Sequence, residues 1–158
     1  MAESQITKKE LLERTESEDI LDIRVISLVN KGYTHVFQTL SLCSNLVIAY
    51  LQGNKISINE FNYLPKFQNL RKLNLPNNML KCIPHASALK ELTNMRILFL
   101  HNNLVQSYLE LNNILALPEI FHITLYNNHC SLFEGYRHFM VNSIPSLLAL
   151  DNYVITDE

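Results

Sequence analysis

The stretch "NMRILFLHNNLV", residues 94–105, decides the fold because variants of it occur five times along the chain. The other copies are "DIRVISLVNKGY" (22–33), "NLVIAYLQGNKI" (45–56), "NLRKLNLPNNML" (69–80) and "EIFHITLYNNHC" (119–130). The second residue of each copy is apolar, begins at Ile23 and returns every 23 to 25 residues. A later column is leucine in every copy, at Leu28, Leu51, Leu75, Leu100 and Leu125. A periodic apolar pattern of this length predicts stacked structural repeats.

The pattern L-x-x-L-x-L-x-x-N-x-L that the copies share is the signature of leucine-rich repeats. It predicts an α/β solenoid with a parallel sheet on the concave side, one short strand per repeat, and helical caps at both ends. The asparagine column can donate and accept hydrogen bonds toward main-chain groups that each turn leaves inside. An unpaired buried group of this kind costs about 1–3 kcal/mol. We therefore interpret this column as a structural ladder, which Lys31 interrupts in the first repeat: Asn54, Asn78, Asn103 and Asn128.

Composition limits the class of protein. The chain has 158 residues, of which 47% are hydrophobic and 18% charged, as expected for one compact domain. Its net charge of -2 gives no electrostatic footprint for nucleic acid or an anionic membrane. No stretch approaches the roughly 20 apolar residues of a membrane span. Three widely spaced cysteines argue against a disulfide framework. We expect a cytoplasmic or nuclear protein that contacts neither membrane nor nucleic acid directly.

Both ends of the repeat array need covers, because an end repeat exposes core and strand edge. Near the start, Thr7 and Glu10 have the spacing of a capping box, which predicts a short helix near 7–15. Near the end, Asn152 stands where a buried leucine is due, so we expect the last repeat to stop there. The predicted organisation is an N-terminal helical cap or tail (1–19), five repeats (20–132) and a C-terminal cap (133–158).

The segment "GYRHFMVNSIPSLLALD", residues 135–151, resembles the cap of the protein-phosphatase-regulator (SDS22-like) subfamily of leucine-rich repeat proteins. The cap pattern is Tyr-Arg, an apolar helix, and Pro-x-Leu-x-x-Leu-Asp, matched by Tyr136, Arg137, Pro145, Leu147, Leu150 and Asp151. That subfamily includes the axonemal dynein light chain one, the spliceosomal A-prime protein and many ciliary proteins. The final run also resembles leucine-rich repeat proteins that carry a downstream IQ motif. The resemblance covers residues 20–158, and because no IQ motif is present, calmodulin binding is not carried over.

The concave face of the predicted sheet is the candidate binding surface. Its side chains come from alternate strand positions that point away from the core. They include one lysine, no acid, and three aromatic residues that we expect in reach of one another: Tyr50, Phe99 and Tyr126. Exposed apolar patches with aromatic anchors mark protein interfaces and suit a helix or an extended segment. The alternative is that these side chains merely pack on one another along the sheet. The predicted binding residues are Ile48, Tyr50, Gln52, Lys72, Asn74, Ile97, Phe99, His101, His122, Thr124 and Tyr126, and the same face includes Val25, Ser27, Val29 and Pro76.

The sequence gives little support for a catalytic site or a metal site. His101 and His122 stand on adjacent predicted strands, but no acidic residue or cysteine completes a zinc ligand set. Cys130 falls in a column of buried apolar residues, so we interpret it as a small core residue and not as a nucleophile. The sequence shows no Gly-rich phosphate loop, paired-carboxylate cleft or complete nucleophilic set. We therefore expect no enzyme, no metal and no cofactor. Tyr136 and Arg137 should pack on the last turn, and Asp151 should tie the final loop to the cap backbone.

The residues alone indicate a non-catalytic binding module with a concave, aromatic and weakly charged face. The resemblance implies a scaffold or adaptor in the axoneme of motile cilia or sperm flagella, with protein partners in a large assembly. Two alternatives stay open. One is an adaptor in a ribonucleoprotein, which would be nuclear. The other is a phosphatase-regulatory subunit, which would favour acids on the concave face.

Overall fold

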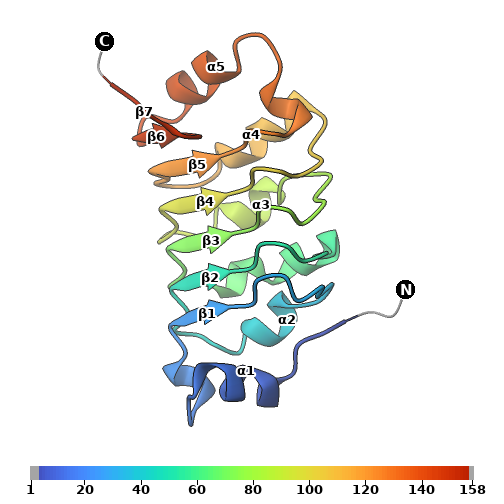
Figure 1. Ribbon diagram of the computed structural model, residues 1–158. Helices are drawn as coiled ribbons and strands as arrows, with labels where there is room; N and C mark the ends of the chain where they lie inside the picture. Colours follow the sequence, from blue (N-terminus) through green and yellow to red (C-terminus); the bar gives the residue numbers. More distant parts are fainter. Residues whose placement is uncertain (1–3, 157–158) are drawn as a thin grey trace.

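The computed structural model describes residues 4–156. The strands are stacked one above another in chain order (Figure 1). Within this range the strands form one seven-stranded sheet in sequence order, parallel from β1 to β6 and antiparallel between β6 and β7. The strands are β1 (Val25–Ser27), β2 (Ile48–Tyr50), β3 (Lys72–Asn74), β4 (Ile97–Phe99), β5 (His122–Thr124), β6 (Ala149–Leu150) and β7 (Tyr153–Val154). The predicted α/β leucine-rich repeat solenoid is confirmed.

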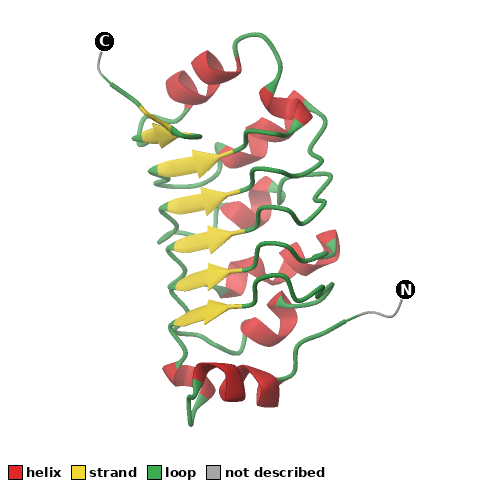
Figure 2. Ribbon diagram, in the orientation of Figure 1, coloured by secondary structure: helices red, strands yellow, loops and turns green. Residues whose placement is uncertain are grey.

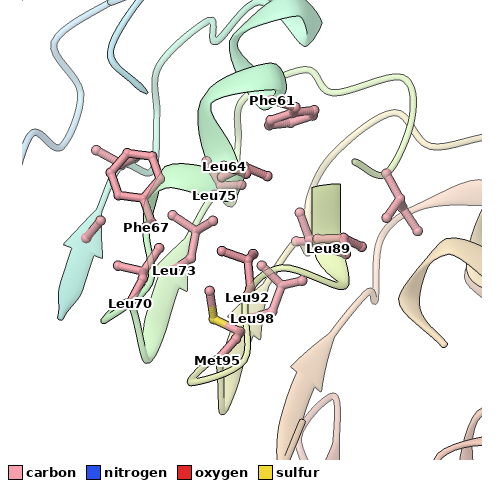
Figure 3. Close-up of a cluster of buried hydrophobic side chains, with 14 of the residues drawn as sticks. Phe61, Leu64, Phe67, Leu70, Leu73, Leu75, Leu89, Leu92, Met95 and Leu98 are labelled. Atoms are coloured by element: carbon pink, nitrogen blue, oxygen red, sulfur yellow. The ribbon is translucent and has the colours of Figure 1, made fainter. Parts of the chain in front are cut away.

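Short helices cover the opposite side of the sheet, as the colouring by secondary structure shows (Figure 2). They are α2 (Phe37–Leu40), η2 (Ile58–Lys66), α3 (Ala86–Leu89), η3 (Tyr108–Glu110), α4 (Leu111–Ile114) and η4 (His129–Ser131), where η marks a 3₁₀-helix. The leucine columns from the strands and the apolar residues of these helices fill the space between them (Figure 3). No helix within residues 4–156 is long and apolar enough to cross a membrane.

Three of the repeats carry two adjacent asparagines, and the two have different tasks. The residue before the ladder position has a left-handed backbone in every repeat, with φ of 55° at Asn30 and 56° at Asn77, Asn102 and Asn127. Gly53, with φ of 73°, takes this position in the second repeat. Asparagine and glycine tolerate this conformation better than other residues. The first asparagine therefore makes the turn, a task that our sequence interpretation did not assign.

The second asparagine pairs the main chain of two turns. Asn103 Nδ2 donates to the carbonyl oxygens of Leu100 at 2.8 Å and Leu75 at 3.0 Å. Its Oδ1 accepts from the backbone N–H groups of Asn78 at 2.9 Å and Leu80 at 3.1 Å. The other ladder residues are also buried and bond to neighbouring turns: Asn54, Asn78 and Asn128. The side chain of Lys31, in the first repeat, is exposed.

A second column of hydrogen bonds lies where the strands begin, and the sequence interpretation missed it. Asn45, Asn69 and Asn94 donate from Nδ2 to the backbone carbonyl of the preceding repeat, at 2.9, 3.0 and 2.7 Å respectively. Ser146 donates to the Ile120 carbonyl at 2.7 Å in the last turn. The asparagine that opens three of the repeated segments was the available signal. In the fifth repeat Glu119 takes this column.

A buried carboxylate on the helical side holds a helix of the preceding repeat. Glu60, on η2, is 2% exposed, and its Oε2 accepts from the backbone N–H groups of Val36 and Phe37 at 2.8 and 2.7 Å. These groups belong to the N-terminus of α2, where Val36 offers no capping side chain. A carboxylate at a helix N-terminus satisfies free donors and opposes the helix dipole.

The ends of the array carry helices. Helix α1 (Lys8–Thr15) begins after Thr7, whose hydroxyl accepts from Glu10 N–H at 3.1 Å, as the capping-box spacing predicted. A short η1 (Ile20–Asp22) leads into β1. At the other end α5 (Tyr136–Ser143) precedes β6, and the chain reverses after Asp151 into β7, a strand that the sequence did not predict. The division into 1–19, 20–132 and 133–158 stays a prediction, and residues 1–3 and 157–158 lie outside the described residues.

Candidate protein-binding face

Lys72 occupies the centre of the concave face, on β3 between β2 and β4. Its ammonium nitrogen lies 5.2 Å from the centre of the Tyr50 ring and 5.4 Å from that of Phe99. Both distances suit a cation–π interaction. Because a lysine separates them, Tyr50 and Phe99 do not form a ring pair. The expectation that Tyr50, Phe99 and Tyr126 lie in reach of one another is not met by direct ring contacts, because Lys72 lies between Tyr50 and Phe99, and His101 lies between Phe99 and Tyr126.

Two histidines connect the aromatic side chains farther along the face. The His101 ring stacks on Tyr126 with centroids 4.4 Å apart and planes 10° apart. His122 meets Phe99 edge-on at 4.9 Å. His101 Nδ1 lies 2.7 Å from the Thr124 hydroxyl, and burial lowers the pKa of His101 from its ordinary value, although Asp151 acts in the opposite direction. The lowered pKa favours the neutral ring of His101. The His101 ring also lies 6.1 Å from Phe99, so these four rings form a continuous aromatic strip.

Some predicted face residues lie deeper than expected. Asn74 is 9% exposed and Thr124 is 3% exposed, so these two side chains form the floor of the face and do not project from it. Thr124 lies next to the longer side chain of His101, whose Nδ1 is 2.7 Å from its hydroxyl. Half-buried side chains that remain accessible are Ile48, Tyr50, Gln52, Lys72, Ile97, Phe99, His101, His122 and Tyr126.

Unpaired polar groups accompany this strip. Gln52 Oε1 and Asn74 Oδ1 are buried and accept no hydrogen bond from any described residue. The ion pairs found among residues 4–156 do not include Lys72. Most buried polar atoms in folded proteins are paired, so these two acceptors call for an explanation. Among residues 4–156, the centre of the face thus combines a cation without a carboxylate partner and two acceptors without donors.

The cap closes the end of this face through Asp151. Its Oδ1 accepts from the backbone N–H groups of Leu125 at 2.7 Å and Tyr126 at 3.0 Å, and Tyr136 donates its hydroxyl to Oδ2 at 3.2 Å. The expectation that Asp151 bonds to the cap backbone is wrong, because its carboxylate reaches the turn of the fifth repeat. Burial raises the pKa of Tyr136, which keeps its hydroxyl a donor.

The remaining cap residues divide between core and surface. Leu147 and Leu150 are buried, whereas Pro145 and Arg137 are exposed. The Arg137 guanidinium lies 5.9 Å from the centre of the Tyr153 ring on β7. Arg137 therefore contacts the terminal hairpin.

The cysteines are poor nucleophiles. Cys130 is 1% exposed, and burial raises the pKa of its thiol to about 11, as it does for Cys43. Burial and the charge of Glu110 also raise the pKa of Cys82, which lines a recess of about 330 Å³ on the helical side. A reactive cysteine needs the opposite shift. Within residues 4–156, no three His, Cys, Asp or Glu side chains gather as metal ligands would.

Sequence comparison finds relatives that share the repeats. No family model matches the chain. The chain is 35% identical over 124 residues to the human leucine-rich repeat and IQ domain-containing protein 3, a match that covers 77% of this chain and 19% of the human protein. The mouse protein is 33% identical with the same coverage. The bovine leucine-rich repeat-containing protein 51 is 33% identical over 58 residues, or 37% of this chain and 30% of that protein. The chain thus matches about a fifth of the length of the first two relatives.

Solved structures share the fold. The crystal structure of the Drosophila melanogaster SNF/U2A′ complex contains a chain with a TM-score of 0.80 and 19% identity, covering 98% of this chain and 87% of that one. A Leptospira interrogans leucine-rich repeat protein has a TM-score of 0.65 and 21% identity, covering 94% and 35%. These identities establish the architecture alone. Together with the relatives in sequence, they identify the chain as a leucine-rich repeat protein that resembles the leucine-rich repeat and IQ domain-containing proteins.

Proposed function

We propose that the chain is a non-catalytic protein-binding adaptor that holds a helix or an extended segment of a partner on its concave face. The observation that carries this proposal is the half-buried Lys72, placed between Tyr50 and Phe99 with no carboxylate partner in the described part of the chain. Aromatic residues are enriched at the centres of protein interfaces, so Tyr50 and Phe99 are the anchors that we expect there.

The alternative, that the face is only internal packing, explains less. Packing alone gives no reason for the two buried acceptors that have no donor among the described residues, Gln52 Oε1 and Asn74 Oδ1. Donors of a partner would satisfy these acceptors once the side chains covering them shift.

For the biological setting we propose a cytoplasmic scaffold in the axoneme of a motile cilium or sperm flagellum. This rests on the resemblance of the cap to ciliary members of its subfamily and on the relatives with an IQ domain. The fold likeness to a chain of the SNF/U2A′ complex keeps the ribonucleoprotein adaptor, located in the nucleus, as the second candidate.

The test is a pull-down from ciliated-cell or sperm lysate, read by mass spectrometry, with three baits. The first is the wild type and the second is Tyr50→Ser/Phe99→Ser/Tyr126→Ser. The third is Ile58→Ser/Leu109→Ser/Leu132→Ser, which removes exposed apolar residues away from the concave face. We expect axonemal proteins with the first and third baits and their loss with the second. Equal recovery with all three would contradict the concave site, and spliceosomal partners would contradict the axonemal setting.

A further inference from the structure

The edge of the sheet where the strands begin carries a column of arginines. The residues directly before β1, β3 and β4 are Arg24, Arg71 and Arg96, and Val47 precedes β2. The Arg24 carbonyl accepts from Val47 N–H at 2.7 Å, and the Val47 carbonyl accepts from Arg71 N–H at 2.8 Å, so these residues are neighbours across the strands. Two strand spacings put the Arg24 and Arg71 backbones roughly 10 Å apart.

A polar recess lies between these two arginines. Its volume is about 350 Å³, and it is lined by Arg24, Asn45, Val47, Asn69, Arg71 and Asn94. The asparagines use Nδ2 to bond the backbone of the preceding repeat, so they contribute no charge. Neither Arg24 nor Arg71 takes part in an ion pair among residues 4–156.

The third arginine shows what this position binds. Arg96 Nη2 lies 2.8 Å from Glu119 Oε2. Glu119 stands in the column of Asn45, Asn69 and Asn94, one repeat after its arginine. Asn45 stands in the same relation to Arg24, and Asn94 to Arg71. The chain therefore supplies a carboxylate to one arginine of the column and a neutral amide to the other two.

We propose that Arg24 and Arg71 bind carboxylates of an acidic segment of a protein partner, in the way that Glu119 binds Arg96. A guanidinium group pairs with a carboxylate through charge-assisted and often bidentate hydrogen bonds. Nucleic acid is the less suitable ligand, because phosphate binding relies on many cationic contacts and the chain has a net charge of -2. This edge goes beyond the concave face and is formed by other residues.

Fluorescence anisotropy with a labelled oligoglutamate peptide tests the proposal on the full chain. We expect Arg24→Ala/Arg71→Ala to weaken binding about tenfold or more, as the loss of charge-assisted bonds predicts. The matched control is Lys31→Ala/Lys55→Ala, which removes the same charge from exposed residues that follow β1 and β2. This control should keep nearly the wild-type affinity. Absence of binding by the wild type, or an equal loss in the control, would overturn the proposal.

A second variant keeps both arginines. Asn45→Glu/Asn94→Glu gives Arg24 and Arg71 an internal carboxylate like Glu119. This variant should weaken binding of the peptide as strongly as loss of the arginines does. Circular dichroism verifies folding of each variant. Unchanged affinity in this variant, or tighter binding of a single-stranded RNA of equal charge than of the peptide, would refute the carboxylate site. The variant Tyr50→Ser/Phe99→Ser/Tyr126→Ser should bind the peptide normally, so failure of the concave face and failure of this edge are distinguishable.

Discussion

Asn103 Oδ1 accepts a hydrogen bond from the backbone N–H of Asn78 at 2.9 Å, so the ladder residue of one repeat holds the ladder residue of the repeat before it. The same oxygen accepts from Leu80 N–H, and Nδ2 donates to the carbonyl groups of Leu75, Leu100 and, at 3.3 Å, His101. One side chain therefore bonds five main-chain groups.

Replacement of this residue should be costly. Asn103→Ala leaves buried donors and acceptors without partners, and we expect the free energy of unfolding to fall by about 1–3 kcal/mol. Urea denaturation measures it. Asn62→Ala is the control, because Asn62 is exposed on η2. A loss in Asn103→Ala no larger than in the control would contradict the ladder.

Alanine substitutions at two glycines with the same backbone conformation distinguish backbone strain from steric crowding. Gly32 and Gly53 both have φ of 73°, but a Cβ on Gly53 would lie 1.7 Å from Asn30 Oδ1, whereas nothing lies within 4 Å of a Cβ on Gly32. Gly32→Ala should cost about 1–2 kcal/mol, the cost of a left-handed non-glycine residue. Gly53→Ala should lower the melting temperature further. Adding Asn30→Gly to Gly53→Ala should restore the additional loss of melting temperature. If the melting temperature does not recover, the Asn30 side chain is not the source of the crowding.

His101 should make stability depend on pH. Its pKa is lowered in the folded protein, mainly by burial, so folding favours the neutral ring. This contribution is fully present above the ordinary histidine value of 6.5 and is lost as pH falls through the lower folded value. The wild type should therefore lose more stability between pH 7 and pH 5 than His101→Gln. Thermal melts across this range measure it, with His129→Gln, an exposed residue, as the control. Parallel profiles for wild type and His101→Gln would contradict the assignment.

Tyr50 should matter for binding and little for stability. The side chain is half-buried on the concave face and contacts the Lys72 ammonium. Tyr50→Ala should leave the melting temperature nearly unchanged while reducing recovery of partners in the pull-down. A Tyr50→Ala protein that unfolds would instead show that the residue belongs to the core.

The repeat could be predicted well because its columns are periodic in sequence. Leu28, Leu51, Leu75, Leu100 and Leu125 are all buried, and the strands pair in the register that the alignment of the copies predicts. Residues in the same column have the same structural role, so comparing the copies was sufficient to predict the fold and the position of the ladder.

Contacts between residues of different columns could not be predicted in this way. Glu60 bonds the start of α2, and Asp151 bonds the turn after β5, because the chain brings separate columns of adjacent repeats together. Lys72 separates Tyr50 from Phe99 because long side chains on one face lean over their neighbours. The left-handed turn of Asn30, Asn77, Asn102 and Asn127 depends on backbone geometry, for which the double asparagine was only an indirect sign.

The ladder also has a mechanical consequence. Each asparagine reaches only the adjacent turns, so no side chain of the ladder connects distant repeats. Pulling the two ends of the solenoid apart would load these short connections in series. In repeat proteins, stability is approximately a sum of the stabilities of the repeats and of the interfaces between neighbours. We therefore expect the repeats to unfold one after another under tension, so that the molecule lengthens in steps of one repeat.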